Sequence, residues 1–249
     1  MKKITLILIT VLFLFLHFRY KPAAINSIVH IQWTALLKKH VNNNGDVNYK
    51  GFIKDSLKLN KYLNLLSNNA PDSLWSKNEQ FAYWINAYNA FTVKLIIQNY
   101  PLKSIKDLGS TATNNSPWDK KFFTIGGKQM TLNIIEHEIL RKQFNDPRLH
   151  FAINCASYSC PKLLNKAFES SRLDAQLNER AKDFMNDTSK NILAKKNARL
   201  SSILLWYGTD FTKTGVSKIE YINRFSKIKI DTTANVTYLK YNWALNEQK

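Results

Sequence analysis

The sequence predicts an α+β fold, a single mostly helical domain packed on a small antiparallel or mixed sheet. Helical patterns outnumber strand patterns along the chain, and no regular alternation of strand and helix is present. No internal repeat or low-complexity linker divides the folded part. We therefore expect one domain over residues 28–249, behind an N-terminal hydrophobic signal or anchor at residues 1–24.

The N-terminus has the layout of an export signal. Lys2 and Lys3 precede a run dominated by Ile, Leu, Val and Phe over residues 4–18, and Arg19 and Lys21 follow it. A cleaved signal peptide and a retained membrane anchor both fit, because no clear small-residue cleavage site follows the run. We expect the folded part to be exported and extracytoplasmic, either secreted or anchored to the membrane by this segment.

The first helical patterns precede residue 70. Residues 29–37 have amphipathic spacing, and the Asn-rich cluster at residues 42–46 ends the pattern. Val47 and Tyr49 then indicate a short extended piece. Leucines at helical spacing predict a second helix over residues 52–66.

The best defined helix begins after Ser76. Ser76 and Glu79 have the spacing of a capping box, and the apolar run continues to Ile97. Asn86 and Asn89 lie three residues apart and therefore on one face of this helix. Buried amides need hydrogen-bond partners, so these two either pin a loop or line a ligand pocket. Loop pinning is favoured, because most side-chain hydrogen bonds go to the backbone.

A hairpin is predicted near the middle of the chain. Residues 122–125 and 128–130 flank Gly126 and Gly127, a two-residue hairpin signal. A brief helical turn over residues 104–109 precedes it.

A helix with polar candidate residues follows the hairpin. Thr131 is placed to cap its first turn. His137 and Arg141 lie one turn apart on it, whereas Glu136 projects about a hundred degrees away from His137. The helix therefore presents ionisable side chains in more than one direction.

The next segment concentrates reactive side chains. Alternating apolar and polar residues over 149–153 predict a short half-buried strand that carries His150. A polar turn follows it, and both cysteines of the chain, Cys155 and Cys160, lie there. Thiols in an oxidising compartment tend to pair, so a disulfide that closes a small loop is one alternative and free thiols are the other.

Three further elements are expected in the last third of the chain. Ser171 and Asp174 have capping-box spacing at the start of a helix that ends at Met185. One of two adjacent serines caps a short helical turn over residues 203–207. A last strand lies around residues 236–238.

A large positive charge is typical of nucleic-acid-binding proteins, but the way it is distributed along this chain argues against nucleic acid as a partner. The net charge is +18, from 36 basic and 18 acidic residues, yet the lysines are dispersed and no nucleic-acid motif accompanies them. A membrane or an anionic wall polymer could attract such a chain. The H-x4-C-x4-C spacing is wider than that of usual zinc sites, so we assign no metal ligand and no cofactor.

Several motifs occur in an order that resembles family 547 of the domains of unknown function. They are FAYWINAYNAF at 81–91, YPLKSI at 100–105, the Gly-Gly hairpin, LNIIEHEILR at 132–141, HFAINCASYSCP at 150–161 and LSSILLWYGTDF at 200–211. The resemblance runs from about residue 33 to about residue 225, and it implies no assigned activity. The residues that match its most distinctive motifs are Trp84, Asn86, Tyr88, Asn89, Glu136, His137, Arg141, His150, Cys155, Cys160 and Asp210.

These residues predict a shared pocket for a small-molecule or envelope-polymer ligand near the cysteine loop, the Glu136 helix and the asparagine helix. The candidate catalytic residues are Cys155, Cys160, His150, His137 and Glu136. The candidate ligand-binding residues are Asn86, Asn89, Arg141 and Asp210.

Two functions remain open. The first is a cell-envelope binding or scaffold domain in which a Cys155–Cys160 bridge clips the loop and the polar residues form a buried network. The second is a thiol hydrolase or acyl transferase acting on an envelope amide or ester, with a cysteine as nucleophile and a histidine as base. On an ideal strand His150 and Cys155 would point to opposite faces, so His137 is an equally good base.

Overall fold

The computed structural model describes residues 24–109 and 115–249, with side chains from residue 30 onward. The predicted signal or anchor at residues 1–24 lies outside the described residues, apart from Ala24. Among the residues described, no helix is both long and apolar enough to cross a membrane. Helices dominate and the sheets are small, which is consistent with the predicted α+β class.

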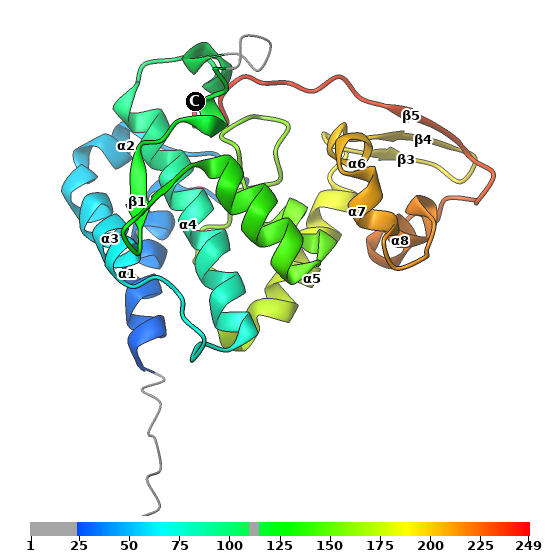
Figure 1. Cartoon of the computed structure of the whole chain (residues 1–249). Helices are drawn as coiled ribbons and strands as arrows, with labels where there is room; N and C mark the ends of the chain where they lie inside the picture. Colours follow the sequence, from blue (N-terminus) through cyan, green and yellow to red (C-terminus); the bar gives the residue numbers. More distant parts are fainter. Residues whose placement is uncertain (1–23, 110–114) are drawn as a thin grey trace, which may run out of the picture.

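Four helices build one side of the molecule (Figure 1). They are α1 (Ala24–His40), α2 (Tyr49–Lys54), α3 (Ser56–Asn68) and α4 (Lys77–Gln98). The capping box of Ser76 and Glu79 is present at the start of α4, which confirms the prediction. Because α4 is buried along most of its length, the largest hydrophobic cluster of the structure surrounds it.

The helix predicted over residues 52–66 is divided at Asp55. The Asp55 carboxylate accepts hydrogen bonds from Lys39 (2.6 Å) and His40 (2.8 Å) at the end of α1, so a tertiary contact holds the break. Tyr49 begins α2, and the expected extended piece is reduced to Val47.

The hairpin prediction is confirmed. Strands β1 (Phe123–Ile125) and β2 (Lys128–Met130) pair antiparallel, and Gly126 and Gly127 have φ values of 58° and 74°. Before it lie the short 3-10 helices η1 (Ile105–Leu108), which fits the predicted helical turn, and η3 (Pro117–Asp119).

The helix after the hairpin, η4 (Ile134–Phe144), is wound as a π-helix. The Thr131 hydroxyl accepts a hydrogen bond from the Ile134 N–H (3.0 Å), as the predicted cap requires. The wider winding changes the angle between successive side chains, which the sequence pattern did not indicate.

The predicted strand over residues 149–153 is wrong. The chain forms a 3-10 helix, η5 (Pro147–Phe151), in which Pro147 occupies the first turn and the Asp146 side chain accepts the Arg148 N–H. All five residues of the predicted strand are buried, so the alternation of polar and apolar residues does not mark a solvent face. His150 is polar but buried, and its ring contacts a carboxylate. A local sequence pattern cannot distinguish such a buried polar side chain from one that faces solvent.

The second side of the molecule holds the smaller helices and a mixed sheet (Figure 1). Its helices are α5 (Leu173–Asn186), α6 (Ile203–Trp206), α7 (Gly208–Thr212) and α8 (Lys218–Phe225). The 3-10 turn η6 (Ser170–Arg172) precedes α5, so the predicted Ser171 cap is wrong and Arg172 is the N-terminal flanking residue.

Three short strands form the mixed sheet. They are β3 (Ile192–Leu193), β4 (Asn197–Leu200) and β5 (Asn235–Tyr238), of which only the last was predicted. Strand β4 pairs antiparallel with β3 and parallel with β5. A second hydrophobic cluster packs between this sheet and helices α5 to α8.

After β5 the chain crosses back to the helical side (Figure 1). This C-terminal segment, residues 239–249, makes isolated bridges from Ala244 to Ser104, from Leu245 to Ser157 and from Glu247 to Val47. It therefore ties together parts of the chain that are far apart in sequence.

The two asparagines of α4 pin loops, as favoured from the sequence. The Asn86 amide accepts the Phe168 N–H and donates to the Phe168 carbonyl, both at 2.9 Å. The Asn89 amide donates to the Ala152 carbonyl (3.0 Å) and accepts the Asn154 N–H (2.8 Å). Each amide thus forms hydrogen bonds with buried backbone groups that solvent does not reach.

We expect Asn86→Ala and Asn89→Ala each to lower the free energy of unfolding by about 1–3 kcal/mol, because each leaves a buried N–H and a carbonyl unpaired. Asn64→Ala is the matched control, since Asn64 is exposed on α3. Urea titration with an unchanged slope measures the difference. Equal small losses in all three variants would contradict the pinning role.

Candidate functional site

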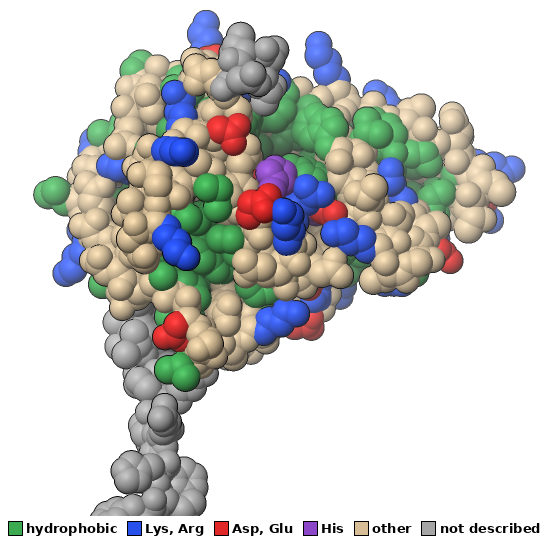
Figure 2. Space-filling view, viewed as in Figure 1, with side chains coloured by type: hydrophobic (Ala, Val, Ile, Leu, Met, Phe, Trp, Pro, Cys, Tyr) green, Lys and Arg blue, Asp and Glu red, His purple; other side chains and the backbone are tan. Residues whose placement is uncertain are grey.

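A cavity of about 300 Å³ lies between the two hydrophobic clusters. On the face shown in Figure 2, hydrophobic side chains gather in a hollow with a histidine and charged side chains at its edge. The residues that line the cavity are Tyr88, Ser116, Trp118, Asn133, Glu136, His137, His150, Ile153, Cys155, Cys160, Pro161, Ile203, Trp206, Tyr207, Tyr241 and Trp243. They come from α4, η3, η4, η5, the cysteine loop, α6 and the C-terminal segment, so the cavity exists only in the folded chain.

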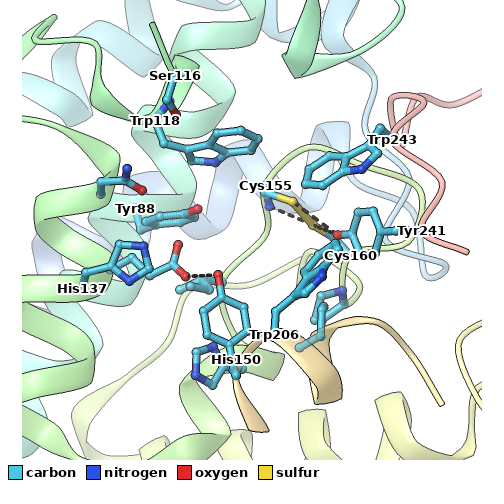
Figure 3. A pocket seen from close by; sticks show the side chains of 16 residues that line it. Tyr88, Ser116, Trp118, His137, His150, Cys155, Cys160, Trp206, Tyr241 and Trp243 are labelled. Carbon is cyan, nitrogen blue, oxygen red and sulfur yellow. Dashed lines mark hydrogen bonds between the residues drawn. A yellow bond between two sulfur atoms is a disulfide. The ribbon is translucent and has the colours of Figure 1, made fainter. Parts of the chain in front are cut away.

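Aromatic rings form much of the wall (Figure 3). Trp243 stacks on Trp206 with ring centroids 5.8 Å apart, and it meets Trp118 edge to face at 5.7 Å. Tyr241 lies 4.5 Å from Trp243 and 4.8 Å from Trp206 by the same measure. The Lys106 ammonium sits 4.3 Å from the Trp243 ring centroid and helps to hold that ring.

Tyr241 and Trp243 were missed from the sequence. They belong to the C-terminal segment and lie more than eighty positions from the cysteines. The available signal was a cluster of aromatic residues just after the last predicted strand, but nothing local showed that the segment crosses to the cysteine loop.

The polar end of the cavity is centred on Glu136. This side chain is 5% exposed, and it accepts a hydrogen bond of 2.6 Å from the Tyr207 hydroxyl. Burial, followed by the nearby Glu136 carboxylate, raises the pKa of both Tyr88 and Tyr207, so both phenols remain protonated donors. His137 lies beside Glu136 and contacts Arg141 through its Nδ1 atom at 3.0 Å.

The cysteines form a disulfide between Cys155 and Cys160, with Cα atoms 6.3 Å apart. Of the two alternatives left open by the sequence, the bridged pair is therefore the one present. Ser157 and Tyr241 place their hydroxyl groups beside the sulfur atoms. In this state neither cysteine is a thiol that could act as a nucleophile.

Asp210 joins segments from both sides of the molecule. Its carboxylate accepts two hydrogen bonds from the Arg141 guanidinium (2.6 and 3.0 Å) and one from His150 Nε2 (2.8 Å), and Lys213 lies 3.2 Å away. Burial by itself would raise the pKa of Asp210, but the contacts with His150, Arg141 and Lys213 outweigh it and hold that pKa far below its usual range. The His150 ring stacks on Tyr207 with centroids 4.0 Å apart.

The structure gathers all five candidate catalytic residues at one cavity, namely Cys155, Cys160, His150, His137 and Glu136. The four candidate ligand-binding residues do not line it. Asn86 and Asn89 are occupied by backbone groups, and Arg141 and Asp210 bind each other. From the asparagine helix only Tyr88 reaches the cavity. The catalytic and ligand-binding roles themselves stay predictions.

His150 and Cys155 do not lie on opposite faces of one strand, because residues Pro147–Phe151 form η5. His150 directs Nε2 to Asp210, and its other ring atoms pack on Tyr207. Within the described ranges, no group of three or more His, Cys, Asp and Glu side chains is arranged to hold a metal ion.

Residues 73–185 match the model of a family described as "Protein of unknown function, DUF547". This match confirms the resemblance over the motifs at 81–91, 100–105, 132–141 and 150–161, whereas the motif at 200–211 lies outside the matched residues. The matched region begins before α4 and ends within α5, so it contains Glu136, His137, His150 and both cysteines. Trp206, Tyr207, Tyr241 and Trp243 lie outside it. No curated protein and no solved structure matches the chain.

The pH dependence of the free energy of unfolding tests whether buried His150 is neutral in the folded chain. Burial lowers the pKa of His150 from its ordinary value of about 6.5, against the opposing hydrogen bond to Asp210. Below that value the unfolded chain binds a proton that folded His150 does not, so the free energy of unfolding falls as the pH falls.

We expect His150→Gln to show a smaller loss of unfolding free energy than the natural chain between about pH 7 and about pH 5. Gln keeps a donor for Asp210 but does not titrate. Burial also lowers the pKa of His30, to about 4, and that contribution is common to both proteins. Urea titrations across the range measure the difference, and identical slopes would contradict a neutral buried His150.

Proposed function

We propose that the chain is an exported or membrane-anchored cell-envelope protein whose cavity beside the Cys155–Cys160 loop binds a small-molecule or envelope-polymer ligand. The observation that carries the proposal is the composition of the cavity. Apolar rings line it, and a few polar groups, chiefly Glu136 and His137, converge at one end. Concave, mostly apolar sites with few polar groups are typical of ligand pockets.

The wall chemistry favours a ligand with a flat apolar face. Trp118, Trp206 and Trp243 offer ring faces and edges on which a sugar ring or another planar group can pack. The buried Glu136 carboxylate accepts hydrogen bonds from the phenols of Tyr207 and Tyr88, and at this polar end of the cavity it favours a ligand with a hydroxyl or amine donor. An amino-sugar unit of an envelope polymer has both features.

The proposed location rests on two observations. The first is the charge pattern of residues 1–24, with lysines before an apolar run. The second is the disulfide, because such bonds persist in oxidising compartments outside the cytoplasm. The dispersed positive charge would also favour contact with anionic envelope polymers.

A Cys/His thiol hydrolase or acyl transferase is the second candidate. It is favoured by one observation, that Cys155, His137 and Glu136 line the same cavity. It requires prior reduction of the disulfide, because only a thiolate can attack an amide or ester. Hydrolysis that depends on a reductant and is lost in Cys155→Ser would favour this candidate over ligand binding alone.

We expect Glu136→Gln to weaken binding of a soluble N-acetylglucosamine oligomer or of its de-N-acetylated form by roughly tenfold, through loss of a charge-assisted hydrogen bond. Glu138→Gln is the matched control, since Glu138 is exposed on the same helix and pairs with Lys142. Fluorescence of the cavity tryptophans reports binding. No fluorescence change with either oligomer, or equal losses in both variants, would contradict the proposed ligand.

Removal of residues 1–24 tests the proposed location. We expect the shortened chain to remain in the cytoplasm, while the full chain becomes accessible to protease added outside the cytoplasmic membrane. Cell fractionation and protease accessibility measure this. Export of the shortened chain would contradict the assignment of these residues as a signal or anchor.

A further inference from the structure

The two cysteines of the disulfide differ in exposure. Both cysteines line the cavity, but Cys155 is partly exposed whereas Cys160 is 4% exposed. A sulfur atom that enters the cavity therefore reaches Cys155 more readily than Cys160. Figure 3 shows the bridge on the cavity wall with the Tyr241 hydroxyl beside it.

Hydrogen-bond donors also favour one sulfur over the other. Cys160 Sγ accepts the backbone N–H of Cys155 at 3.0 Å, and the hydroxyls of Ser157 and Tyr241 lie 3.2 Å from it. The same hydroxyls are farther from Cys155 Sγ, at 3.3 and 3.5 Å. Each hydroxyl lies near both sulfur atoms and can donate only one proton. The Cys155 N–H is therefore the donor that distinguishes the two sulfur atoms, because it contacts Cys160 Sγ.

The surrounding loop holds these donors in place. The Asn154 side chain accepts the Ala156 N–H and donates to the Pro161 carbonyl, both at 2.8 Å, so it spans the loop. Its own N–H is bound to Asn89 of α4. Burial raises the pKa of Tyr241, which keeps its hydroxyl protonated at neutral pH.

We propose that Cys155–Cys160 is a thiol–disulfide exchange site for a small dithiol that enters the cavity. One thiolate of the dithiol attacks Cys155 Sγ, the Cys155–Cys160 bond breaks, and its electron pair leaves on Cys160 Sγ. The N–H of Cys155 and the Tyr241 hydroxyl stabilise the Cys160 thiolate, and the Ser157 hydroxyl donates to the Tyr241 oxygen at 2.9 Å. Hydrogen-bonded thiolates of low pKa are better leaving groups.

The second thiol of the dithiol completes the exchange. It attacks the sulfur of the dithiol in the mixed disulfide, so Cys155 leaves as a thiolate and the dithiol becomes a cyclic disulfide. Two electrons pass from the dithiol to the protein, and its two protons are taken up by the cysteines or released to solvent according to pH. The step does not require that the cavity also binds an envelope ligand.

The rate of reduction by dithiothreitol tests this proposal without any envelope ligand. We expect the folded chain to react at least about tenfold faster than the same chain unfolded in urea at the same pH, because only the folded loop aims the donors at Cys160. A buried structural disulfide gives the opposite order. Slower reduction of the folded chain would therefore overturn the proposal.

Tyr241→Phe tests the donor role directly. We expect it to slow reduction roughly threefold to tenfold, through loss of one hydrogen bond to the leaving sulfur. Tyr221→Phe is the matched control, because the buried Tyr221 hydroxyl has no hydrogen-bond partner among the described residues. Equal rates for the two variants would overturn the assignment of Tyr241.

A monothiol cannot complete the exchange, so it shows which sulfur is attacked first, independently of the Tyr241 variant. After a brief reaction of the oxidised chain with 2-mercaptoethanol and acid quenching, peptide mass spectrometry should find the mixed disulfide on Cys155 and a free thiol at Cys160. A mixed disulfide mainly on Cys160 would reverse the proposed direction of attack.

Discussion

The amide of Asn89 is the contact on which the candidate site depends most. It binds the carbonyl of Ala152 and the N–H of Asn154, two buried backbone groups at the start of the cysteine loop. Because packing fixes α4 along most of its length, hydrogen bonds to this amide fix the start of the cysteine loop relative to the core. Together with the bridge between Ser157 and Leu245, the amide holds the cysteine loop beside the cavity.

The seam between the two hydrophobic clusters provides the remaining constraint. Asp210 binds Arg141 from η4 and His150 from η5, so a single carboxylate connects elements that belong to different clusters. Burial of a charge is favourable only when partners surround it, and here three cationic or hydrogen-bonding groups do so. The cavity lies next to this junction, where Tyr207 contacts both His150 and Glu136.

Local signals predicted those parts of the fold that depend on neighbouring residues. The Ser76 capping box fixed the start of α4, and the two glycines identified the hairpin, because both signals act within four residues. The strand over residues 149–153 failed because both its polar and its apolar side chains are buried by distant elements. The helix break at Asp55 likewise depends on a contact with α1.

The sequence predicted the reactive residues of the site, but not the aromatic residues that form its walls. Glu136, His137, His150 and the cysteines stand out as reactive residue types, and they meet at one cavity. Tyr241 and Trp243 have no such chemical signal, and their place depends on a C-terminal segment that crosses the molecule. Arg141 and Asp210 had the chemistry of ligand-binding residues but satisfy each other.

The disulfide is the feature on which the cavity wall and its proposed chemistry both rest, and intact mass after alkylation tests it most directly. The protein would be taken from the compartment to which the cell delivers it, denatured and alkylated with and without prior reduction. We expect no alkyl group without reductant and two with it. One or two alkyl groups on the unreduced protein would contradict the bridge between Cys155 and Cys160.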